Sequence, residues 1–145
     1  MQEFIGYFLI IAGYIVGLGS VTVIDILGFL GRTSSYWTES TIRAHKVTKP
    51  LIWVGLFLIL FGGILFFQNK ELTKNLIYLI LIFTILVING IFLSFYVSPI
   101  LLERERKGKI KEILPPSLQS KIFISFIISF FGWWGSLLFF LYYTK

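Results

Sequence analysis

The chain contains no cysteine and only one histidine. The absence of cysteine excludes disulfide bonds, thiolate metal sites and cysteine nucleophiles. A structural zinc site is not expected either, because it needs four ligands drawn mainly from cysteine and histidine. The sequence also has no nucleophile elbow, phosphate-binding loop, zinc-protease motif or dinucleotide fingerprint. We therefore expect a protein without a metal centre that is not an enzyme.

Charged residues are scarce too, at 14% of the chain, whereas apolar residues make up 57% and aromatic residues 19%. A soluble domain of 145 residues has no interior large enough for this apolar content. The long uncharged runs instead predict an all-α integral membrane protein, a four-transmembrane-helix antiparallel bundle in one membrane domain. The predicted spans cover residues 4–30, 50–67, 76–102 and 122–143 of the domain 1–145.

The formal net charge is +6, but the cations lie in short loops between apolar runs, which does not suit nucleic-acid binding. Loops 32–49 and 103–121 hold ten of the thirteen lysines and arginines. The positive-inside rule places such loops in the cytoplasm, so we expect both termini outside, in a cytoplasmic-type cell membrane. The cations expected to contact anionic lipid headgroups are Lys46, Lys49, Arg104, Arg106, Lys107, Lys109 and Lys111.

Two prolines mark expected helix boundaries. Residues 38–48 form a predicted short interfacial helix in the first cytoplasmic loop, and Pro50 is expected to open the second span. Pro99 is expected to kink or end the third span near the interface.

Small residues recur on one face of three spans, where they allow close helix packing. They are Gly13 and Gly17 in the first span, Gly55 and Gly62 in the second, and Ser125, Ser129 and Gly132 in the fourth. These faces predict contacts within the bundle or between copies in a homo-oligomer. Asn89 lies inside the third span, and its amide is expected to need a partner on a neighbouring helix.

Asp25 is the only acidic residue inside an apolar segment. A carboxylate there is costly by a few kcal/mol and should face the bundle or water. Our leading interpretation is a structural cluster in which Asp25 pairs with Arg32, Arg43 or His45 and fixes the first hairpin of a non-enzymatic membrane protein. The alternative is a small proton- or ion-coupled transporter in which Asp25 exchanges a proton for a cation.

Two families share features with this pattern. A carboxylate in the first of four spans is similar to that of the small multidrug-resistance exporters, and this resemblance implies proton-coupled transport through Asp25. Four glycine-rich spans also resemble small membrane bundles that hold b-type haem. That resemblance implies His45 as one axial ligand, with the second supplied by another copy.

Overall fold

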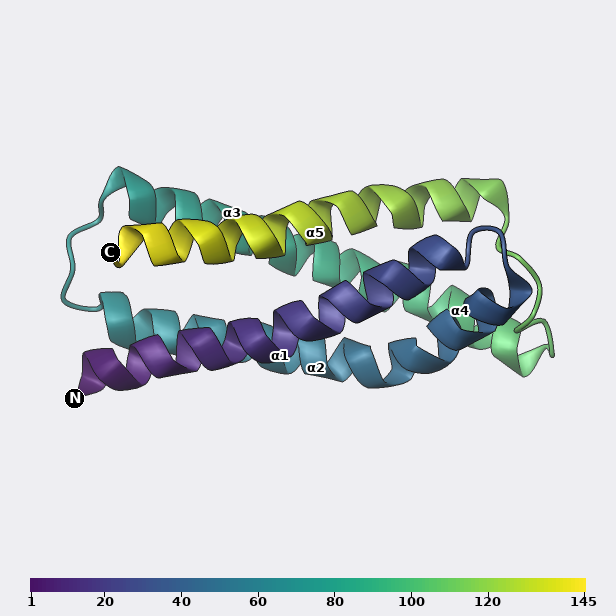
Figure 1. The fold of residues 1–145 in the computed structure, drawn as a ribbon, viewed down its shortest axis with the longest axis horizontal. Helices are drawn as coiled ribbons and strands as arrows, with labels where there is room; N and C mark the ends of the chain where they lie inside the picture. The colour runs from purple at the N-terminus through teal and green to yellow at the C-terminus, as the bar shows by residue number, and fades with distance from the viewer.

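The computed structural model describes all residues 1–145, which form long helices joined by short turns (Figure 1). The elements are α1 Gln2–Leu30, α2 Ser35–Phe67, α3 Lys74–Phe92, the π-helical turn η1 Leu93–Val97, α4 Ser98–Arg106 and α5 Pro116–Tyr143. α3, η1 and α4 together make one helix over Lys74–Arg106. Four helices are therefore long and apolar enough to cross a membrane, as a multi-pass membrane protein requires.

Successive long helices run in opposite directions along the molecule (Figure 1). Both termini lie at one end, together with the turn 68–73, and we call this the termini end. Turns 31–34 and 107–115 lie at the other end, which we call the basic end because most lysines and arginines are near it. Gly108 in the second turn has a φ of 71°, a conformation that glycine adopts without strain.

The turn between α1 and α2 is held by side-chain hydroxyls. Ser34 caps α2, since its side chain accepts a hydrogen bond from the Trp37 amide at 3.5 Å. The Thr38 Oγ1 donates to the carbonyl oxygens of Gly31 at 2.7 Å and Ser34 at 2.9 Å. These bonds tie the end of α1 to the first turn of α2 and set the register of the hairpin.

The predicted boundary at Pro50 is wrong, because α2 runs from Ser35 to Phe67 with Pro50 inside it. Residues 38–48 are thus the first part of a long helix rather than a separate one. A proline removes one helical hydrogen bond, and Pro50 lies at an exposed position of α2. Packing against α1 on both sides of the proline, at Thr38 and at Gly55, keeps the helix continuous.

Pro99 does not end its helix either. The Ser98 amide donates to the Leu93 carbonyl five residues earlier, so the helix widens to a π-helical turn and continues to Arg106. A proline ring clashes with the carbonyl four residues before it, and the wider turn relieves this clash.

Glycines bring α1 and α2 into backbone contact. A methyl group added at Gly13 would lie 2.7 Å from the Gly55 carbonyl oxygen, and one at Gly62 would lie 2.7 Å from the Gly6 carbonyl oxygen. A methyl group at Gly17 would strike the ring of Trp133, which comes from α5. The first hairpin is therefore packed more closely than any larger residue at these positions would allow.

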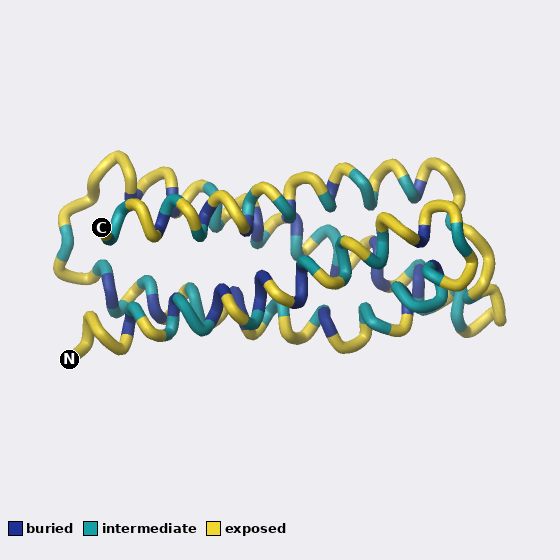
Figure 2. The backbone as a smooth tube through the Cα atoms, in the orientation of Figure 1, coloured by how far each residue is buried: buried dark blue, intermediate teal, exposed yellow.

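The interior has two apolar clusters, and Figure 2 shows buried positions on the inward sides of the helices. The larger cluster includes Tyr14, Leu56, Trp133 and Phe140 and lies in the termini half. The smaller one contains Ile42, Val97 and Leu101 at the basic end. Many large apolar side chains point outward. Such a surface suits contact with lipid, whereas in water it would cause the protein to aggregate.

Candidate functional site

A cavity of about 120 Å³ lies at the basic end between α1, α2, η1 and α5. Its polar lining comes from Asp25, Arg32, Thr38, Thr41, His45, Lys49, Ser94, Gln119 and Ser125. The other walls are mostly apolar, and they include Ile42, Trp53, Val97 and Phe123. A space of this size holds a few water molecules or one small solute.

The register of the first hairpin explains why Asp25 and His45 line the same cavity. Thr38 is bonded to Gly31, and a methyl group added at Gly28 would lie 4.0 Å from the Thr41 Cγ2. One helical turn further from the hairpin bend, the next facing positions are Asp25 on α1 and His45 on α2.

Asp25 has no partner in the structure. Its Oδ2 atom is buried without a hydrogen bond, and the residue belongs to none of the ion pairs. The ion pair that we predicted for Asp25 is therefore not formed. A buried carboxyl group without a partner is unusual, because desolvation makes it costly.

The two arginines expected beside Asp25 bind elsewhere. Arg43 is 65% exposed and pairs with Glu39 on its own helix at 2.8 Å. Arg32 lies beyond the end of α1, so it no longer follows the helical face that carries Asp25. Its guanidinium carbon lies 4.9 Å from the centre of the Phe123 ring, at the edge of the cavity.

His45 and Lys49 contribute two further polar groups to the cavity. The Nε2 atom of His45 is buried and has no hydrogen-bond partner. The Lys49 Nζ donates to the Ser94 carbonyl oxygen and to the Ser98 Oγ, each at 3.3 Å. Beside them the Trp53 Nε1 donates to the Ser94 Oγ at 3.0 Å.

Sequence reasoning assigned Lys49 to lipid headgroups and missed Ser94 and Trp53. The signal that points to them is Pro99. The Ser98 amide bonds the carbonyl five residues earlier, and in the same pattern the amide of residue 99 would bond the Ser94 carbonyl. Residue 99 is a proline and has no N–H to donate. The Ser94 carbonyl is thus available, and Lys49 from α2 takes the place of the missing donor.

Asn89 lies next to the cavity and joins α3 to α5. The Ser125 Oγ donates to the Asn89 Oδ1 at 2.7 Å, and the Asn89 Nδ2 donates to the Ser125 carbonyl oxygen at 3.2 Å. Further along α5, Ser129 is buried and a methyl group at Gly132 would lie 2.6 Å from the Leu86 Cδ2. The small residues of α5 therefore face α3.

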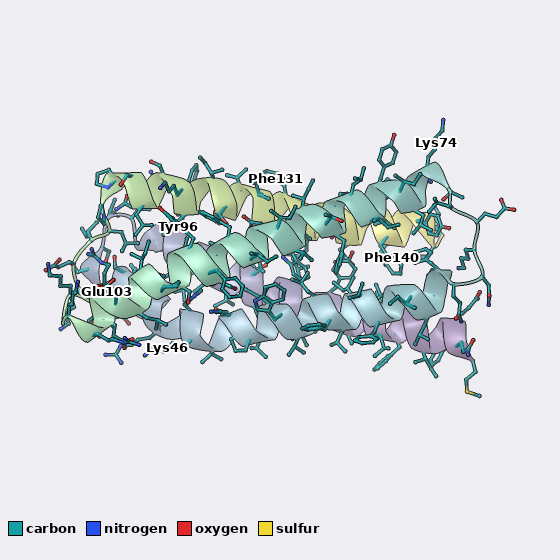
Figure 3. All side chains as sticks on the ribbon, turned by 180° about the vertical axis from the view of Figure 1, so that it is seen from behind. Lys46, Lys74, Tyr96, Glu103, Phe131 and Phe140 are labelled. Atoms are coloured by element: carbon teal, nitrogen blue, oxygen red, sulfur yellow. The ribbon has the colours of Figure 1, made fainter.

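Several of the cations assigned to lipid headgroups have carboxylate partners. Lys46 pairs with Glu105 at 2.7 Å, and Lys107 pairs with Glu103 at 2.7 Å; Figure 3 shows Lys46 and Glu103 at the same end. Arg104 lies 3.7 Å from Glu112. Those that remain exposed and outside any ion pair are Arg106, Lys109 and Lys111.

The residues around His45 do not form a two-ligand haem site within one chain. No second histidine exists, and Met1 is 98% exposed at the termini end. A haem macrocycle is also far larger than a cavity of about 120 Å³.

The chain was compared with protein-family models, curated proteins and solved structures. None of them matches it.

Proposed function

We propose that this four-helix antiparallel membrane bundle is a small proton- or ion-coupled transporter. In this proposal the basic-end cavity binds a small solute, and Asp25 is the group whose protonation changes with solute binding. The observation that carries the proposal is that the Asp25 Oδ2 is buried, unpartnered and beside a cavity. An intramembrane carboxyl group that faces a cavity is free to exchange protons and ions.

The structural-cluster interpretation needs a partner for Asp25, and none of Arg32, Arg43 and His45 forms an ion pair with it. A catalytic role needs a nucleophile bonded to a base. The His45 Nε2 and the Asp25 Oδ2 bond no serine or threonine hydroxyl. We therefore propose a non-enzymatic role.

A second cavity supports transport across the bundle. It has a volume of about 290 Å³ in the termini half and is lined almost wholly by apolar residues, with Tyr14 and Ser136 as its polar groups. Along α1, α2 and α5, the residues lining the two cavities are separated by Gly17, Gly55 and Trp133 respectively. Gly17 lies against both Trp133 and Gly55, so in this proposal Trp133 moves away from Gly17 when a solute passes.

The test uses the purified full-length chain in liposomes that contain a pH-sensitive dye. Gradients of sodium, guanidinium, tetramethylammonium, chloride, bromide or nitrate are imposed one at a time, and the pH of the lumen is recorded. We expect at least one gradient to move protons in the wild type and none in Asp25→Asn. The control is Glu39→Gln, which changes an acidic residue that is bonded to Arg43 and does not line the cavity.

Two results would contradict the proposal. One is a wild type that gives no solute-driven pH change with any gradient. The other is an Asp25→Asn variant that moves protons as the wild type does. The unfolding temperature in detergent is measured for each variant, so that loss of fold is distinguished from loss of coupling.

A further inference from the structure

The charges around the basic-end cavity do not favour a cation as its ligand. The charged or titratable residues that line it are Asp25, Arg32, His45 and Lys49, all from α1, α2 or the turn between them. The lining residues of η1, α4 and α5 carry no charge. With His45 neutral, two cations face one carboxylate. When Asp25 binds a proton, both cations are left without a balancing charge.

Lys49 is the central cation of this arrangement. It is half-buried within α2 and forms no ion pair. Its two hydrogen-bond acceptors, the Ser94 carbonyl and the Ser98 hydroxyl, are both neutral. An ammonium group has three N–H donors, so one remains free. An enclosed cation of this kind lacks a counter-ion.

Two more donors are available at the same wall of the cavity. The Ser94 Oγ accepts a hydrogen bond from Trp53, and its own O–H is given to no protein acceptor. The His45 Nε2 atom is buried without a partner and donates when it carries the ring proton. Lys49, Ser94 and His45 therefore supply up to three donors toward one small ligand.

We propose that the cavity binds a small monovalent inorganic anion together with a proton on Asp25. Lys49 and Ser94 hold the anion, and Arg32 attracts it at the cavity edge. The anion and an ionised Asp25 repel each other, whereas a protonated Asp25 does not. Proton binding and anion binding thus favour each other, and this coupling is reciprocal. The proton enters and leaves on the carboxyl oxygen, and no covalent bond to the anion forms.

This inference rests on the proposed transport function and names its cargo. It predicts that an inward gradient of chloride, bromide or nitrate acidifies the lumen of the liposomes. Sodium, guanidinium and tetramethylammonium gradients should have no effect. If cation gradients drive proton exchange and anion gradients do not, the transport function stands and the anion proposal is overturned. If no gradient moves protons, both fail.

Lys49→Met tests the anion site directly. We expect it to lower anion-driven proton flux about tenfold at subsaturating anion, because the anion loses its cationic ligand and, with it, the binding that favours the proton on Asp25; couplings between two sites are typically about 5–150-fold in affinity. The matched control is Lys46→Met, because Lys46 is on the same helix but is paired with Glu105 outside the cavity. Lys49→Arg keeps the charge and should retain part of the flux. A Lys49→Met variant that folds normally and transports anions as well as Lys46→Met would overturn the assignment.

Discussion

Asn89 on α3 and Ser125 on α5 join the two helices by a pair of hydrogen bonds. Ser125→Ala removes the hydroxyl that donates to the Asn89 Oδ1 and leaves that buried oxygen without a partner. Hydrogen bonds between membrane helices contribute about 0.6 kcal/mol on average, and up to about 1.7 kcal/mol. We expect Ser125→Ala to lower the free energy of unfolding in mixed micelles by about 1 kcal/mol.

The matched control is Ser129→Ala. Ser129 is buried on the same helix, one turn further on, and its hydroxyl forms no hydrogen bond to a neighbouring helix. Its replacement should change stability by less than half as much. Equal losses at Ser125 and Ser129 would mean that the bond to Asn89 contributes nothing beyond packing.

At the residue scale, the sequence shows which side chains belong to the site better than it shows which residues they bond to. Asp25, His45 and Asn89 stand out because polar residues are rare in apolar runs, and all three lie in or beside one site. Asp25 was expected to pair with Arg32, Arg43 or His45, and Arg32 follows it by seven residues, a spacing that keeps two residues on one face of a helix. That spacing fails because α1 ends at Leu30, two residues before Arg32. A helix end is set by turn contacts such as Thr38 to Gly31, which spacing does not contain.

At the element scale, the hairpin of α1 and α2 depends on glycines with different surroundings. A methyl group at Gly55 would lie 2.5 Å from the Gly17 Cα, whereas one at Gly63 would meet nothing within 4 Å. We expect Gly55→Ala to destabilise the protein by about 1–3 kcal/mol through overpacking. Gly63→Ala should be neutral or stabilise by up to about 1 kcal/mol, because alanine is the better helix former.

Unfolding of both variants in the same detergent checks this difference. The two glycines are on one helix, so composition and helix propensity change equally. Similar stability for Gly55→Ala and Gly63→Ala would show that α1 and α2 do not approach each other as closely as the structure has them.

The sequence predicts the number of helices better than it predicts where each helix begins and ends. Their number and apolar character follow from long uncharged runs, which only helices can carry through lipid. Their ends do not, since Pro50 was expected to open a span and Pro99 to kink or end one, and both lie within continuous helices. Whether a proline ends a helix depends on the contacts around it. Lys49 provides one such contact at Ser94, and it comes from another helix.

At the scale of the whole molecule, charge is distributed unevenly between the two ends. Arg106, Lys109 and Lys111 remain exposed at the basic end, whereas the only lysines or arginines at the termini end are Lys70, Lys74 and Lys145. The positive-inside rule counts lysines and arginines near the span ends whether or not they are paired. We therefore propose that the basic end, with its cavity, faces the cytoplasm and anionic headgroups, and that both termini are outside.

The absence of cysteine makes this orientation testable without background labelling. Asn69→Cys places a thiol in the exposed turn at the termini end, and Ser117→Cys places one on an exposed site at the basic end. A membrane-impermeant maleimide added to intact cells should label Asn69→Cys at once and Ser117→Cys only after lysis. The reverse order would place the cavity on the outer side. Protons and anions would then reach the cavity from outside the cell rather than from the cytoplasm.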